Sequence, residues 1–173
     1  MKPVLLVIAP ETFRDEELFE TQKVLGDAGI STVIASTHTG TCTGKLGGTA
    51  EATIALKDAN SKNYEAIAFI GGMGSEVYFK NAEARTIAHE FYDDDKIVSA
   101  ICIAPVILAN AGLLKGKQAT VFPDGAETLR NCGAHYTGEA VTVDGNIITG
   151  NGPASSVAFG EMLASKIKEQ AAS

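Results

Sequence analysis

Short aliphatic runs recur along the chain, and stretches with helical spacing of apolar positions follow them. The runs contain few polar side chains, which is typical of strands buried on both faces of a sheet. They cover residues 4–9, 31–36, 66–70 and 97–101. The helical stretches cover residues 14–28, 82–92, 105–111 and 154–170. This alternation predicts βαβ units, and so an α/β fold with a mainly parallel sheet and helices on both faces.

The segments between these elements carry turn signals. Residues 37–53 are rich in Thr and Gly and indicate a loop or a small hairpin. Residues 118–122 have a strand-like pattern, and a short helix is expected over 124–131. Asp144-Gly145-Asn146 separates two short β-type runs, which predicts a late β-hairpin. No repeat or linker interrupts the pattern, so we expect one domain over residues 1–173.

Charge disfavours two classes of partner. The formal net charge is −7, and of the 14 Lys and Arg residues only Arg14, Arg85 and Arg130 are arginines. Because binding to a phosphate backbone requires clustered basic side chains, we expect no nucleic-acid partner and no anionic membrane surface.

The cysteine count indicates the compartment. Three cysteines are too few, and odd in number, for a disulfide framework. The apolar run at residues 4–9 is too short for a secretion signal, and no stretch approaches the ~20 apolar residues of a membrane span. We therefore expect a reduced, cytoplasmic protein.

One cysteine has a distinctive position. Cys102 comes directly after the run at 97–101 and directly before a helical pattern, which predicts a tight strand-to-helix turn similar in logic to a nucleophile elbow. A helix N-terminus lowers the pKa of a thiol, and adjacent backbone N–H groups can bind an oxyanion. The alternative is that Cys102 is an ordinary small buried side chain.

An acidic residue in the first helix is the second candidate. Glu17 begins a stripe at i, i+4, i+7 and i+11 whose other members are Thr21, Val24 and Ala28. A buried carboxyl has a raised pKa and exchanges a proton near neutrality. Alternatively, Glu17 is an exposed first-turn acid stabilised by the helix dipole.

A glycine-rich turn follows the run at 66–70. Gly71-Gly72-Met73-Gly74-Ser75 permits close backbone approach and places an N–H group near a reacting atom, although a simple turn explains it equally well. It lacks the complete spacing of a phosphate-binding loop.

The remaining histidines and cysteines are not expected to carry chemistry. His38, His89 and His135 are expected to have no catalytic role, with His89 facing solvent, and Cys42 and Cys132 are expected to be ordinary thiols. No metal-ligand spacing is visible, so no metal and no cofactor is expected.

Together, these motifs resemble the ThiJ/PfpI superfamily, which includes the Parkinsonism-associated deglycase/chaperone proteins and the PfpI-type intracellular peptidases. The matching segments are residues 15–18, 70–72, 100–105, 143–146 and 149–153. The resemblance implies a flavodoxin-like three-layer α/β sandwich and a homodimer or larger assembly. It also implies a reactive Cys102 contacted by Glu17, with oxyanion donors at the backbone N–H groups of Gly72 and Ile103.

The chain departs from the family pattern at three positions. Ile103 stands where PfpI-type peptidases have a histidine base, which weakens the peptidase interpretation. Phe122 stands where some deglycase-like members have a histidine before proline. Asn151 occupies a segment in which many members carry arginine.

The leading hypothesis is a cofactor-independent cysteine enzyme that acts on small reactive carbonyls, in the manner of a glyoxalase or deglycase. Cys102 forms a hemithioacetal, and Glu17 acts as acid and base. Phe13, Arg14, Gly71 and Phe122 are expected to line the pocket. The alternatives are an oxidation-sensing stress protein or chaperone acting through Cys102, and a PfpI-type hydrolase, peptidase or hydratase.

Overall fold

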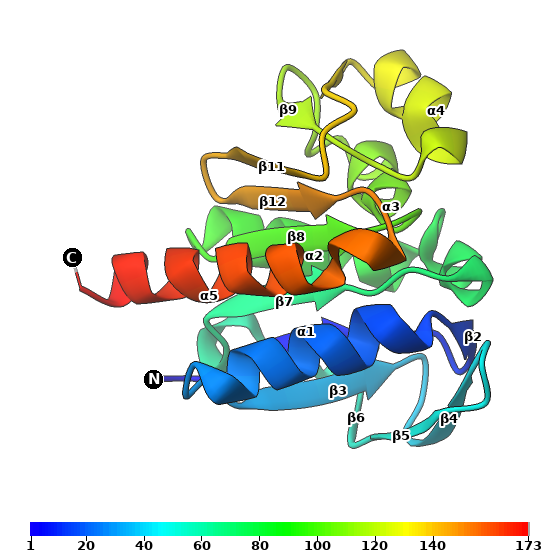
Figure 1. Cartoon of the computed structure of the whole chain (residues 1–173), viewed down its shortest axis with the longest axis vertical. Coiled ribbons are helices and arrows are strands. Elements are labelled where there is room, and N and C mark those ends of the chain that lie inside the picture. The colour runs from blue at the N-terminus through cyan, green and yellow to red at the C-terminus, as the bar shows by residue number, and fades with distance from the viewer. Residues whose placement is uncertain (173) are drawn as a thin grey trace.

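A seven-stranded sheet forms the centre of the computed structural model, which describes residues 1–172 (Figure 1). Its strands are β1 (Val4–Val7), β3 (Thr32–Ser36), β6 (Ile54–Ala55), β7 (Ala66–Phe69), β8 (Ile97–Ile101), β11 (Val141–Asp144) and β12 (Ile147–Gly150). The spatial order is β11-β12-β8-β7-β1-β3-β6, and only the β11–β12 pair is antiparallel. From β3 to β12 this is the 2-1-3-4-5 order of flavodoxin-like folds, which confirms the expected fold class and the late hairpin.

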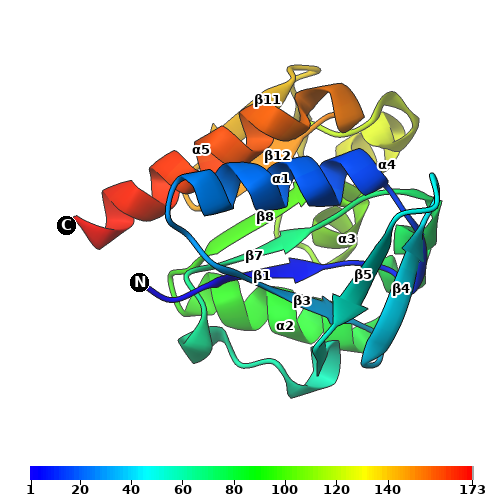
Figure 2. The same ribbon diagram turned by 60° about the horizontal axis from the view of Figure 1, so that its bottom comes forward.

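Helices cover both faces of this sheet (Figure 2). The helices are α1 (Asp15–Asp27), α2 (Ala82–Asp93), α3 (Pro105–Asn110), α4 (Ala126–Asn131) and α5 (Ser156–Ala171). α1 and α5 pack side by side on one face, and α2 and α3 lie on the other. Alternate residues of β1 therefore enter different cores: Leu6 packs with Leu18 and Phe159, whereas Leu5 packs with residues of α2 and α3. Burial on both faces explains why the strands read as continuous aliphatic runs.

Two smaller sheets extend the fold. One contains β2 (Glu11–Phe13), β4 (Gly40–Gly44) and β5 (Thr49–Ala52), and the other contains β9 (Gln118–Ala119) and β10 (His135–Tyr136). The 3₁₀ turns are η1 (Leu56–Asp58), η2 (Ser61–Asn63), η3 (Met73–Tyr78), η4 (Pro123–Gly125) and η5 (Pro153–Ser155). The Thr- and Gly-rich segment is thus a hairpin, β4–β5, while β2 and η3 were not predicted.

Two expectations were wrong. The strand expected over residues 118–122 ends at Ala119 because Thr120 bonds side chains and loops instead of a neighbouring strand: its N–H donates to Thr149 Oγ1 and its hydroxyl to the Glu139 carbonyl. His89 is half-buried rather than solvent-facing, and its Nε2 lies 2.6 Å from the carbonyl oxygen of Ala111.

No helix within residues 1–172 has the length and apolar character needed to cross a membrane.

A buried carboxylate joins α1 to the β4–β5 turn. Asp15 is 7% exposed, and its two carboxylate oxygens accept the N–H groups of Leu46 at 2.8 Å and Gly48 at 2.7 Å. The Lys45 N–H donates to the Phe13 carbonyl at 2.9 Å. These bonds fix the turn against the N-terminus of α1, close to the ends of the central strands.

We predict that Asp15→Ala lowers the free energy of unfolding by about 1–3 kcal/mol, because two backbone N–H groups lose their acceptor. Asp15→Asn keeps one oxygen acceptor and is expected to cost less. Urea unfolding measures both losses, and amide hydrogen exchange at Leu46 and Gly48 reports the turn itself. Equal stability of the wild type and the alanine variant would contradict this role.

Candidate active site

Three strand ends meet at one edge of the sheet. β1, β7 and β8 are parallel neighbours, so their carboxyl ends lie together, at the position where doubly wound folds bind ligands. The helix α1, which follows β1 by way of β2, carries Glu17. The glycines Gly71 and Gly72 follow β7, and Cys102 follows β8. The topology therefore brings the sequence-predicted residues to one place.

Cys102 has a backbone conformation that is rare for a residue with a side chain. Its φ is +65°, in the left-handed region. The chain holds this elbow from both sides: the Cys102 N–H donates to the Gly150 carbonyl at 2.9 Å, and its own carbonyl accepts the Phe122 N–H at 2.7 Å. The residue is 9% exposed, so little of the thiol is in contact with solvent. The strand-to-helix turn predicted from the sequence is confirmed, and backbone strain at this point is compatible with a functional role.

Glu17 is completely buried beside this elbow. Its Oε1 accepts the Gly71 N–H at 2.9 Å, while Oε2 has no hydrogen-bond partner among the described residues. A Cβ atom built on Gly71 would lie 2.6 Å from Glu17 Oε1 and 2.7 Å from Cys102 Cβ, which shows how closely the two side chains converge on this glycine. The φ of Gly71 is not positive, so space alone requires glycine here.

The carboxyl and the thiol influence each other's protonation. Burial raises the pKa of Glu17 to about 7, against smaller lowering effects of the Cys102 thiol and the Gly71 N–H. Burial and the Glu17 carboxylate raise the pKa of Cys102 to about 12. The lowered thiol pKa expected from the sequence is wrong, because burial and a neighbouring negative charge outweigh the backbone dipoles. Near neutral pH the pair therefore releases one proton, which the carboxyl loses before the thiol.

Two backbone N–H groups are directed at the sulfur. Those of Ile103 and Gly72 lower the pKa of Cys102 as hydrogen-bond donors, and neither donates to another acceptor within residues 1–172. These are the two groups expected to form the oxyanion site. Gly72 has φ +103°, and a Cβ there would lie 2.5 Å from Arg14 N and Thr12 O, so only glycine fits the turn that presents its N–H group.

A cavity of about 290 Å³ opens over Cys102. It is lined by Arg14, Lys45, Gly72, Met73, Glu76, Phe79, Cys102, Ile103, Phe122, Asp124 and Pro153. The positions predicted for Arg14 and Phe122 are thus correct. Phe13 does not line the cavity: its side chain is fully buried in the core and contacts Phe19 edge-on at 6.1 Å between ring centroids. The expectation that Gly71 lines the cavity was also wrong, because Gly71 is enclosed between Glu17 and the Cβ of Cys102.

Several residues that line the cavity were not predicted from the sequence. Met73 is 74% exposed and belongs to η3, which was not predicted, and Phe79 comes from just beyond that element. Lys45 belongs to the turn that Asp15 holds. The one sequence signal that could have indicated Met73 as a cavity residue is its place directly after a glycine pair at the end of a strand.

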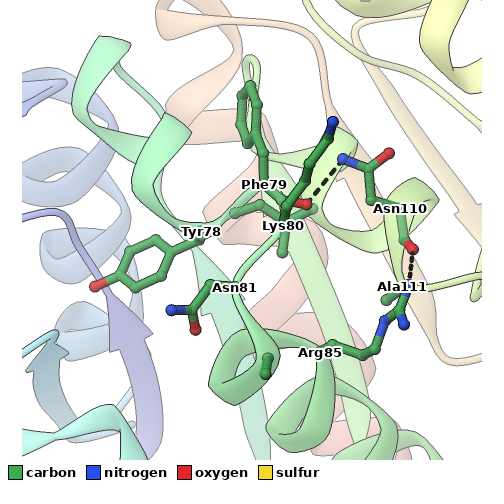
Figure 3. A pocket seen from close by; sticks show the side chains of 9 residues that line it. Tyr78, Phe79, Lys80, Asn81, Arg85, Asn110 and Ala111 are labelled. Carbon is green, nitrogen blue, oxygen red and sulfur yellow. Dashed lines mark hydrogen bonds between the residues drawn. The ribbon is translucent and has the colours of Figure 1, made fainter.

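A second cavity, of about 430 Å³, lies on the other side of Phe79 (Figure 3). The Asn110 side chain donates to the Phe79 carbonyl at 2.8 Å, and Arg85 donates to the Asn110 carbonyl at 2.7 Å. Neither cysteine nor histidine lines this space, whereas Cys102 lines the smaller cavity. No group of three His, Cys, Asp or Glu side chains within residues 1–172 is placed to hold a metal ion.

Comparison with known proteins assigns the family. The model of the DJ-1/PfpI family matches residues 2–166. The chain belongs to this family. It is 45% identical over 160 residues to an uncharacterized protein of Methanocaldococcus jannaschii, covering 91% of this chain and 78% of that protein. It is 31% identical over 149 residues to a deglycase of Pyrococcus abyssi, covering 86% of this chain and 90% of the deglycase.

Solved structures agree with the fold of this DJ-1/PfpI family member. A ThiJ/PfpI domain protein from Brachyspira murdochii superposes with a TM-score of 0.95 at 33% identity, covering 98% of this chain and 99% of the other. The resemblance seen in the sequence motifs is therefore confirmed.

Gly71→Ala tests the convergence of Glu17 and Cys102 in this DJ-1/PfpI family member. The added Cβ would overlap both side chains and the Ile101 carbonyl, so we predict lower stability and a changed rate of Cys102 alkylation by iodoacetamide. Gly26→Ala is the control, because it lies within α1 with nothing inside 4 Å of a Cβ. That variant should gain about 0.5–1 kcal/mol. Wild-type stability and alkylation in Gly71→Ala would contradict the geometry.

Glu17→Gln tests the buried charge. The native carboxyl keeps its proton up to about pH 7, whereas the unfolded chain releases it near the ordinary value of 4.5. Wild-type stability should therefore be full below pH 4.5, fall as pH rises to 7 and then stay level. Glutamine does not titrate, so the variant should exceed wild type by on the order of 3 kcal/mol at pH 8 and by far less at pH 5.

Urea unfolding of both proteins at pH 5 and pH 8 measures this difference. Glu161→Gln, which removes an exposed carboxyl from α5, is the control for the loss of one charge. If the stability gain of Glu17→Gln over wild type is the same at pH 5 and pH 8, a buried Glu17 carboxyl with a pKa of about 7 is refuted.

Proposed function

We propose that this chain is a cofactor-independent cysteine enzyme of the DJ-1/PfpI family that acts on small reactive carbonyls such as glyoxal and methylglyoxal. The observation that carries the proposal is the buried Glu17 carboxyl, which accepts the Gly71 N–H and lies beside the Cys102 thiol at a strained elbow. The deglycase name of relatives at about 30% identity supports the same class of substrate.

The first step forms a carbon–sulfur bond. The Glu17 carboxylate removes the thiol proton as Cys102 Sγ attacks the aldehyde carbon, which compensates for the high pKa of the thiol. The carbonyl oxygen gains negative charge and is stabilised by the N–H groups of Gly72 and Ile103. Protonation of this oxygen by Glu17 gives a hemithioacetal.

The second step is an internal redox shift. Glu17 removes the proton from the former aldehyde carbon and delivers it to the neighbouring carbonyl oxygen, which gives an enediol. Glu17 then takes the proton of the hydroxyl on the sulfur-bearing carbon and returns it to the neighbouring carbon, which leaves a thioester. One carbon is oxidised, the other is reduced, and no external oxidant is needed. Water then hydrolyses the thioester, releasing a 2-hydroxy acid and restoring the thiol. Because neither Ile103 nor Phe122 can transfer a proton, Glu17 serves every proton transfer.

A second candidate function is oxidation sensing through Cys102. A neutral Glu17 carboxyl can donate a hydrogen bond from its free oxygen to a cysteine sulfinate, and the N–H groups of Gly72 and Ile103 add two further donors. Intact mass after mild peroxide separates the two functions: a stable gain of about 32 Da at Cys102, two oxygen atoms, without carbonyl turnover favours sensing. The hydrolase alternative is weakened because Ile103 stands where that mechanism needs a histidine base. The expected homodimer and cytoplasmic location stay predictions.

We predict that Cys102→Ala abolishes conversion of methylglyoxal to lactate and that Glu17→Gln lowers kcat/KM by about 10²–10⁴-fold. In the wild type, kcat/KM should rise with pH through about 7, as Glu17 loses its proton and becomes a base, and this limb should be absent from any residual activity of Glu17→Gln. Cys132→Ser, altered at a half-buried thiol at the end of α4, is the control and should keep full activity. The proposal fails if wild type, Cys102→Ala and Glu17→Gln have equal turnover.

A further inference from the structure

The walls of the Cys102 cavity are mostly apolar. Met73, Phe79, Ile103, Phe122 and Pro153 line it together with the thiol. The charged lining residues Lys45, Glu76 and Asp124 are all exposed, which places their charges at the rim. The half-buried Arg14 is paired with Glu16 through two hydrogen bonds of 3.0 Å. The interior therefore offers no unpaired cation to an anionic group.

These walls are held in place by contacts outside the cavity. The Asn110 side chain fixes the Phe79 carbonyl at 2.8 Å (Figure 3), and the Phe122 N–H is bonded to the Cys102 carbonyl. The Phe122 ring lies 3.6 Å from the position of a Cβ on Gly152, so it packs against that turn. The cavity is thus largely formed before any ligand enters, which lowers the entropic cost of binding.

The oxyanion site determines where a substituent must point. When the N–H groups of Gly72 and Ile103 hold a carbonyl oxygen next to the sulfur, the substituent on the carbonyl compound extends away from the elbow. Met73, Phe79 and Phe122 are among the residues that line the cavity the substituent enters. A hydrogen atom or a methyl group leaves most of this apolar surface in contact with water, whereas an aromatic ring covers it.

We infer that the Cys102 cavity selects carbonyl compounds that carry an aryl-sized apolar substituent over small or anionic ones, with Phe122 as a specificity-determining residue. The inference deepens the proposed function and rests on it for the reaction, but the selectivity belongs to the cavity and is measurable without turnover.

Thiol alkylation is the first test. Rates of Cys102 modification by N-phenylmaleimide and by maleimide are measured by peptide mass mapping, and each is divided by the rate with free N-acetylcysteine. We expect the normalised rate with the aryl reagent to be at least about tenfold higher, since the ring is buried against the walls. Phe122→Gln should reduce this preference by about 3–10-fold. Its backbone N–H, which holds the elbow, is unchanged.

Val143→Gln is the matched control. Val143 is 38% exposed, close to the 37% of Phe122, but belongs to β11 and does not line the cavity. It should keep the wild-type preference. A wild-type preference near one, or an equal preference in wild type and Phe122→Gln, overturns the inference.

Turnover separates this inference from the proposed reaction. The ratio of kcat/KM for phenylglyoxal to that for methylglyoxal should fall in Phe122→Gln, through KM more than kcat. Turnover of both aldehydes with a ratio that Phe122→Gln leaves unchanged overturns the inference while the proposed function stands. An aryl preference in alkylation without turnover of either aldehyde supports the cavity assignment and refutes the proposed reaction.

Discussion

The hydrogen bond from the Gly71 N–H to Glu17 Oε1 is the interaction on which the candidate site depends. It joins the carboxyl end of β7 to the first turn of α1 and fixes a carboxyl inside the core, where the adjacent thiol belongs to the turn after β8. Two separate segments of the chain must be in place before this bond can form, and a third brings the thiol beside the carboxyl. A carboxyl with only one backbone donor in an apolar setting keeps its proton to about pH 7, so the architecture of the sheet is what sets its chemistry.

Most of the fold could be predicted from the sequence, because strands buried on both faces are aliphatic runs and the helices that cover them have an apolar stripe. Cys102 and Glu17 were also identifiable, one from its place between a strand and a helix and the other from its apolar stripe. The direction of the thiol pKa could not be predicted, since it depends on Glu17 lying beside Cys102 in space. The burial of Phe13, the short length of β9 and the wall formed by Phe79 likewise depend on tertiary contacts that local pattern does not encode.

The site combines a polar floor with apolar walls. The Cys102 thiol and the elbow that presents the N–H groups of Gly72 and Ile103 line the cavity, the Glu17 carboxyl is buried beside the thiol, and Met73, Phe79 and Phe122 form apolar walls. Under the proposed function this division separates reaction from recognition: the floor would serve any aldehyde, and the walls would discriminate among its substituents. The two parts come from different elements, so substitutions in η3 or before η4 can alter selectivity while the elbow keeps its geometry.

The left-handed backbone at Cys102 has a consequence for how this protein changes over evolutionary time. A side-chain-bearing residue at φ +65° is strained, and glycine at the same position would relieve that strain, just as an apolar or amide residue would relieve the buried charge at Glu17. Selection for stability alone would therefore remove both residues. Lineages that retain the pair give up folding free energy at two adjacent points, and in any set of relatives these two positions should change together when the chemistry is abandoned.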